Sequence, residues 1–148
     1  MDDRAELVEL MSHYADIADL EEFDALPRKV FTDELTLDFE SVTGMPPMTV
    51  PLNDYVEVLR TSFAPFKATH HAITSHVVGI GEDTATIHAH VRAEHWLPDE
   101  AAAGCWLVVG FYDNEAVRTP HGWRLTRVKL TAIHQENAPR LPAVAAAG

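Results

Sequence analysis

The stretch HYADIADLEEFDAL, residues 13–26, lies on an amphipathic pattern that organises the first half of the chain. Its apolar side chains continue a series that recurs at spacings of three and four residues: Leu7, Met11, Tyr14 and Ala18. This repeat is typical of a helix packed on a core, and it predicts a helix over residues 3–19. Asp19 lies at the edge of the apolar stripe. Because an unpaired buried carboxylate is costly, we expect it to have a partner, and nine histidines supply the choice.

The composition indicates one soluble domain. A length of 148 residues suits a single core, which we expect over residues 1–136, with a flexible tail over 137–148. The net charge of −12 argues against nucleic acid and against an anionic membrane surface as partners. One cysteine excludes an internal disulfide. Neither a signal peptide nor a membrane-spanning run is evident, so a cytoplasmic protein is expected.

The later residues alternate between polar and apolar, the repeat of half-buried strands. A short helix over 20–31 precedes this region. The remaining expected elements are a strand over 34–40, a loop over 41–51, a helix opened by Asn53 or Asp54, and strands over 70–81, 84–96, 104–117 and 123–135. Helices followed by an antiparallel meander predict an α+β fold.

Alternation within the strands selects the histidines that face inward. Over 84–96 the alanines and aliphatic residues share one parity, and His95 continues it. In the preceding strand His71 shares a face with Ile73, Ser75 and Val77. The sequence therefore proposes an inward-facing polar set: Tyr14, Asp19, His71 and His95.

Such a set suits acid–base chemistry. A carboxylate bonded to one imidazole nitrogen fixes the tautomer and raises the basicity of the other nitrogen. That nitrogen can remove a proton from a substrate carbon, while Tyr14 or His95 donates to a carbonyl or to a departing hydroxyl. Each general acid or base contributes about 10² to 10⁴ in rate. This chemistry requires no cofactor.

Two plainer interpretations stay open at this stage. A histidine or a tyrosine on an apolar face can be a satisfied core residue with no further role. His88 and His90 lie on one face of a strand at a spacing that can serve zinc, but no third ligand is evident nearby, so no metal is expected. Phosphate-binding loops and nucleophile elbows are absent from the sequence.

Three blocks of the chain resemble SnoaL-like proteins of the nuclear transport factor 2-like superfamily. The block YADIADLEEFDALPRKVFTDE is similar to their opening, with matches at Tyr14, Asp19, Phe23, Leu26, Phe31 and Asp33. ATHHAITSHVVGIGEDTATIHAHV resembles the middle segment, where His71 takes the histidine position and Ser75 stands where asparagine is commoner. GFYDNEAVRTPHGWRLTRVKL resembles the closing hairpin, with matches at Tyr112, Asp113, Arg118, Gly122, Trp123 and Arg124.

The resemblance implies a cone: a curved antiparallel sheet around three or four helices of the N-terminal half, with a deep apolar pocket. Scytalone dehydratase, bile-acid dehydratases, steroid isomerase and polyketide cyclases share that cone. Tyr14, Asp19 and His71 match the pocket residues of the dehydratase branch, and His95 is the nearest match for a further polar group. The family also implies a homodimer through the outer face of the sheet, where we expect Trp106, Val108, Gly110 and Tyr112.

These observations favour a cofactor-independent lyase, isomerase or cyclase acting on a small apolar, aromatic or polycyclic molecule. The expected first step is proton abstraction beside a carbonyl by His71, oriented by Asp19. The alternative is a non-catalytic module that binds a small ligand or a protein partner on the same fold. A third possibility is a subunit without a site of its own, comparable to the small subunits of ring-hydroxylating dioxygenases.

Overall fold

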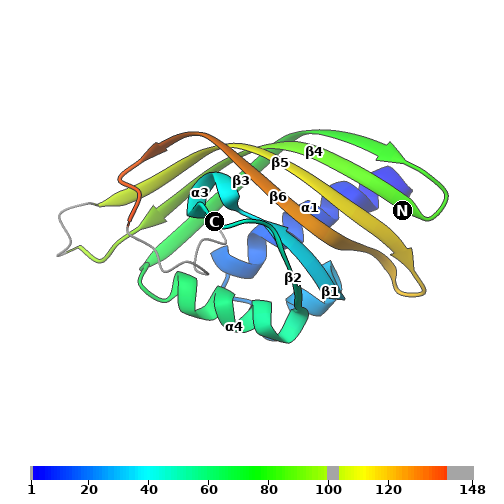
Figure 1. Cartoon of the computed structure of the whole chain (residues 1–148), viewed down its shortest axis with the longest axis horizontal. Helices are drawn as coiled ribbons and strands as arrows, with labels where there is room; N and C mark the ends of the chain where they lie inside the picture. The colour runs from blue at the N-terminus through cyan, green and yellow to red at the C-terminus, as the bar shows by residue number, and fades with distance from the viewer. Residues whose placement is uncertain (1, 100–103, 140–148) are drawn as a thin grey trace.

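The computed structural model describes residues 2–99 and 104–139, which form four helices and six strands. In chain order these are α1 Asp3–Asp19, α2 Leu26–Val30, β1 Phe31–Asp38, α3 Glu40–Thr43, β2 Met48–Pro51, α4 Leu52–Phe63, β3 Ala68–Ile80, β4 Thr84–Trp96, β5 Cys105–Thr119 and β6 Gly122–Glu136. The predicted α+β fold is confirmed. Figure 1 shows the long strands arching over α1, α2 and α4, which lie on the concave side.

The six strands form one curved, unclosed sheet in the order β2-β1-β6-β5-β4-β3. Strands β3 to β6 are antiparallel neighbours, as the meander predicts. The sheet is nevertheless mixed, because β1 runs parallel to β6. An alternating pattern indicates which residues of a strand are buried, but not whether neighbouring strands run parallel or antiparallel. The sequence pattern therefore could not predict the parallel pairing of β1 with β6.

The segment predicted as a loop over 41–51 contains regular structure. It holds the single helical turn α3 and the edge strand β2, which pairs antiparallel with β1. Thr36 and Thr49 join their hydroxyls across that pair at 2.9 Å. Pro51 ends β2, and proline is tolerated at a sheet edge. The four residues of β2 are too few to display an alternation. The prolines and the glycine of this segment therefore indicated a loop.

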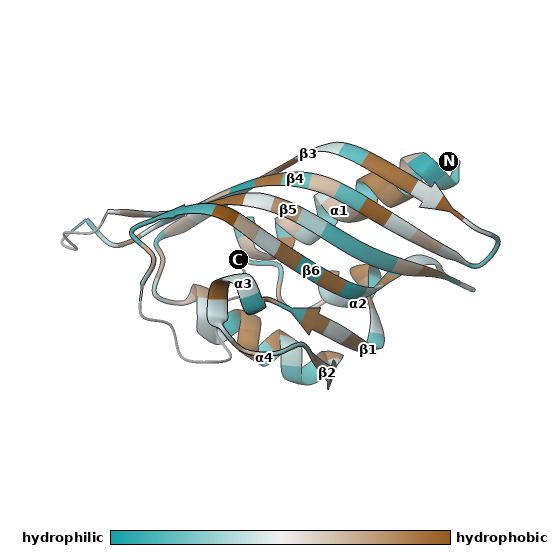
Figure 2. Cartoon of the chain, turned by 45° about the horizontal axis from the view of Figure 1, so that its top comes forward, coloured by the Kyte–Doolittle hydropathy of each residue, from teal (hydrophilic) through white to brown (hydrophobic). Residues whose placement is uncertain are grey.

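The core lies between the inner face of the sheet and the helices. In β4 the predicted parity is buried through Ala85, Ile87, Ala89, Val91 and Ala93. Figure 2 shows the corresponding alternation of hydrophobic and hydrophilic bands along the strands.

The assignment of β5 residues to the outer face was wrong. Trp106, Val108 and Tyr112 are at most 2% exposed and pair with inward-facing residues of β4. Val109 and Phe111 have the opposite parity and lie on the outer face. A strand that is apolar on both parities does not tell which side is the core. The register with β4 decides it.

A bulge in β3 changes the parity that the sequence predicted for its second half. The register with β4 shifts between Thr74 and Val77, and Ser75 has a φ of 57°. His71 precedes the bulge and is inward, as expected. Val77 follows the bulge and is 65% exposed on the outer side. One extra residue in a strand reverses the facing of every residue after it.

The tail predicted over 137–148 lies mostly outside the described residues, which stop at Pro139. Asn137 still belongs to the described part, where its side-chain amide donates to the Cys105 carbonyl oxygen at 2.9 Å. Across the described ranges, the helices are too short and too polar to cross a lipid bilayer.

Gly110 provides a test of the β5–β6 register. A Cβ atom at this position would lie 1.9 Å from the Thr131 carbonyl oxygen, so backbone would have to move. We expect Gly110→Ala to lower the free energy of unfolding by about 1–3 kcal/mol, measured by urea denaturation. Gly79→Ala is the matched control, because its Cβ would meet only the Thr86 side-chain hydroxyl, at 2.9 Å. Equal losses in both variants would contradict the register.

Candidate functional site

Asp19 is the last residue of α1, and its carboxylate faces the edge strand β3. Leu20 caps the helix, and Glu21 adopts a left-handed φ of 54° as the chain leaves it. A negative charge at a helix C-terminus is unfavourable, because the exposed carbonyl groups there carry partial negative charge. The carboxylate therefore needs compensating donors from elsewhere in the fold.

Three donors from β3 supply this compensation. Oδ2 of Asp19 accepts from the His71 backbone N–H at 2.7 Å, and Oδ1 accepts from the Thr69 hydroxyl at 2.9 Å. Oδ1 also lies 2.7 Å from His71 Nδ1. Partial burial acts to raise the pKa of the Asp19 carboxyl, but the hydrogen bonds and the charge of His71, with the Thr69 bond, outweigh it and lower the pKa.

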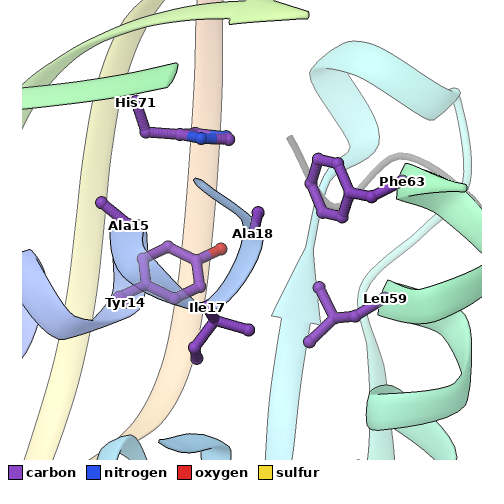
Figure 3. Close-up of a pocket in the computed structure, with 7 residues that line it drawn as sticks. All are labelled: Tyr14, Ala15, Ile17, Ala18, Leu59, Phe63 and His71. Atoms are coloured by element: carbon purple, nitrogen blue, oxygen red, sulfur yellow. The ribbon is translucent and has the colours of Figure 1, made fainter. Parts of the chain in front are cut away.

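His71 lies on the inner face of β3 and is 8% exposed. Its Nδ1 carries the proton that Asp19 accepts, which leaves Nε2 as the basic nitrogen of the neutral ring. Figure 3 shows the His71 ring pointing into a cavity between α1 and α4, opposite Leu59 and Phe63.

Tyr14 reaches the same cavity from the inner face of α1, and its hydroxyl points into it (Figure 3). Its ring packs edge-on against Phe31 and Tyr112 at centroid distances of 5.6 and 5.5 Å. Burial raises the pKa of Tyr14, and the neighbouring Tyr55 and Tyr112 hydroxyls oppose the rise. Tyr14 and Asp19 are about 140° apart on an ideal helix. Asp19 reaches His71 from the helix end, whereas Tyr14 reaches the cavity from the helix side.

His95 is fully buried on β4, and its ring centroid lies 5.4 Å from that of His71. Nδ1 donates to the Trp106 carbonyl oxygen at 3.0 Å, and the ring stacks on Trp106. Desolvation, aided by the nearby His71, lowers the pKa of His95 to about 4. The ring is therefore neutral at pH 7, and Nε2, which has no partner among the described residues, is an acceptor. This geometry does not suit the expected role of proton donor.

The interior cavity is much smaller than the deep pocket that the resemblance implied. Its volume is about 10 Å³, roughly the room that one water molecule needs. Side chains of α4 occupy the rest of the cone, with Leu59 and Phe63 against the Tyr14 and His71 side. The two larger recesses beside Asp19, of about 190 and 360 Å³, lie on the outside of the α1–β3 contact.

Sequence reasoning missed several residues of this site. Thr69 has the same strand parity as His71, two residues away, and that spacing could have identified it. Leu59 and Phe63 belong to the buried apolar side of α4, which by its pattern alone indicates only packing on a core. Their position opposite His71 depends on how α4 packs across the cone, for which the local pattern has no signal.

The histidines considered for zinc lie on the outer face of β4. His88 Nδ1 bonds to Asp113 Oδ1 at 2.8 Å, and the His88 and His90 rings are 6.0 Å apart. Within residues 2–99 and 104–139, no group of three or more potential ligands is arranged to hold a metal ion.

The chain matches the model of the SnoaL-like domain over residues 1–129, and it therefore belongs to that family. The fold is that of the nuclear transport factor 2-like superfamily, in agreement with the resemblance.

Solved structures extend the comparison. The Kfla4162 protein from Kribbella flavida is 72% identical, with a TM-score of 0.90 over 92% of this chain and 94% of that chain. A candidate aromatic ring hydroxylase from Novosphingobium aromaticivorans is 29% identical, with a TM-score of 0.79 over 93% and 96% of the two chains. A candidate scytalone dehydratase from the same organism is similar in fold, at 17% identity and a TM-score of 0.79 over 95% and 89%. The family and the fold support a role in which a small molecule is bound or transformed.

The protonation state of His95 can be tested directly. Because its pKa is lowered to about 4, the folded protein should keep the neutral, Nδ1-protonated ring from pH 8 down to pH 5. The unfolded chain takes up this proton near pH 6.5, so stability should fall between about pH 6.5 and 4. Nitrogen-15 NMR of the imidazoles measures the tautomer, and His95→Phe assigns the signals. Titration of the His95 signal above pH 5 would contradict the assignment.

Asp19 should stabilise the fold in a pH-dependent way. Because its pKa is lowered in the folded state, its contribution is complete above the ordinary carboxyl pKa of about 3.9 and is lost as the pH falls through the folded-state value. We expect Asp19→Asn to lower the free energy of unfolding by about 2 kcal/mol at pH 7 and by less at pH 3. Urea denaturation at both pH values measures this, with Asp16→Asn on the same helix as the control. A pH-independent loss would refute the assignment.

Proposed function

We propose that the chain is a cofactor-independent enzyme that removes a proton beside a carbonyl group of a cyclic, mostly apolar molecule. The outcome of that step is dehydration, isomerisation or cyclisation, all of which begin with the same carbanion or enolate. His71 is the general base, and Asp19 orients it.

The contact between Asp19 Oδ1 and His71 Nδ1 at 2.7 Å carries the proposal. It presents the basic Nε2 to the interior cavity. The two further hydrogen bonds on Asp19 hold the carboxylate in place, so the imidazole keeps one tautomer and one orientation.

Tyr14 is the proposed electrophilic partner. A phenol whose pKa is raised by burial stays protonated, and it can donate to the carbonyl oxygen as negative charge develops there. His95 takes a different part from the one first expected. As a neutral ring with Nε2 free to accept, it can receive a hydrogen bond from a substrate hydroxyl or from water.

The alternative is a binding module that holds a small ligand, or a protein partner, without turning anything over. The cavity of about 10 Å³ argues against turnover, because no reactive molecule fits beside His71 in the present conformation.

We also propose a homodimer through the outer face of the sheet, with a corrected set of residues. Val77 and Ile133 are 65% and 62% exposed, and they lie with the half-buried Val109 and Phe111 on strands of that sheet. Exposed apolar side chains on a sheet suit a self-complementary interface.

Proton abstraction can be measured without knowledge of the natural substrate. Exchange of the acidic carbon-bound protons of 2-tetralone and related mono-, bi- and tricyclic ketones in D₂O is followed by proton NMR. We expect exchange in the presence of the protein, slowed by about 10² to 10⁴ in His71→Gln, because the general base is lost.

His70→Gln is the matched control, since His70 is exposed on the opposite face of the same strand. It should exchange at the rate of the unaltered protein. Full exchange in a folded His71→Gln variant would remove the assignment of the base. Ketone binding without exchange would favour the binding module.

A further inference from the structure

Two hollows meet at one side chain of α4. The interior cavity is lined by seven residues: Tyr14, Ala15, Ile17, Ala18, Leu59, Phe63 and His71. An outer recess of about 190 Å³ opens to solvent beside Asp19, Thr69 and Lys67. The two linings have Ala18 and Phe63 in common, so these two side chains form the wall between recess and cavity.

Phe63 is the only bulky member of that wall. Ala18 contributes a methyl group on a helix that is tied to β3 through Asp19. The Phe63 ring is 8% exposed, lies edge-on to His71 at 6.0 Å and stacks on His95 at 6.0 Å with an 11° interplanar angle. Figure 3 shows the ring facing His71 across the cavity.

The volumes of the two hollows are compatible with a movement of the Phe63 ring into the outer recess. A cavity of about 150 Å³ is known to accept benzene, so a recess of about 190 Å³ has room for a phenyl ring. Rotation of Phe63 into the recess would vacate a ring-sized space beside His71 and His95, where only about 10 Å³ is free now.

The end of α4 is suited to such a movement. Phe63 is the last residue of the helix, followed by Ala64 and Pro65. The side-chain ion pairs that flank it, Arg60–Asp24 and Lys67–Asp99, are exposed, and pairs of this kind stabilise a structure little.

We infer that Phe63 is the gate of the site. It controls entry to the interior cavity, and the space that it vacates limits the reacting part of the substrate to about one six-membered ring. This inference rests on the proposed function, because it takes the cavity beside His71 as the site of reaction. It adds a specificity-determining residue and a substrate class: a molecule that presents a single ring to His71.

The test uses 4-nitrophenol, a one-ring phenol whose absorbance changes when its hydroxyl is hydrogen-bonded. Its association with the full chain is followed by stopped-flow absorbance. We expect Phe63→Ala to accelerate association roughly tenfold or more, because entry no longer waits for a side-chain movement. Phe63→Leu should be intermediate, and it serves if the alanine variant does not fold.

Val58→Ala is the matched control, because Val58 packs against the core from the same helix but lines neither hollow. It leaves the cavity and its wall intact, so its association rate should stay near that of the unaltered protein. Equal acceleration by the two alanine variants, or no association in any of these proteins, would overturn the gate. Equal association rates of Phe63→Ala and the unaltered protein, together with normal ketone exchange, would refute the gate and leave the proposed catalysis standing. Gated 4-nitrophenol entry without any ketone exchange would support the gate and refute the proposed catalysis.

Discussion

The site depends on one carboxylate placed where a helix end least favours it. Asp19 lies at the negative end of α1, and three donors of β3 offset the cost of its charge. The same three bonds do two things. They fasten the helix to β3, which has no further strand beside it in the part of the chain that the structure describes, and they select the tautomer of His71. A single contact therefore both ties α1 to the sheet and sets the tautomer of His71.

Around this contact the interior is apolar and aromatic, and that environment affects the two histidines differently. His71 has a carboxylate beside it, whereas His95 has a carbonyl oxygen and three aromatic neighbours. His95 is desolvated and has no carboxylate in contact with it, so its ring stays neutral. The two imidazoles, about 5 Å apart, therefore differ in the hydrogen bonds that they can form. His71 and Tyr14 line one small cavity, whose opposite side is formed by Leu59 and Phe63 of α4.

Much of this arrangement was readable from local patterns. The stripe of α1 predicted its bounds, and alternation in β4 predicted that His95 faces the core. Predictions failed where a pattern carries no long-range information. The parallel pairing of β1 with β6, the inward facing of Trp106 and the reversal after Ser75 all depend on register between strands, and a one-residue bulge changes that register without changing the composition.

The sequence by itself determined the fold class, the family and the candidate polar residues, because these rest on periodicity and on short motifs within single elements. Only the tertiary structure decided how those residues meet. It brought Asp19 within 2.7 Å of a residue 52 positions away, turned His95 into an acceptor through the Trp106 carbonyl, and placed Phe63 opposite His71 in the cavity. Each of these outcomes depends on packing between distant segments, which local propensity does not encode.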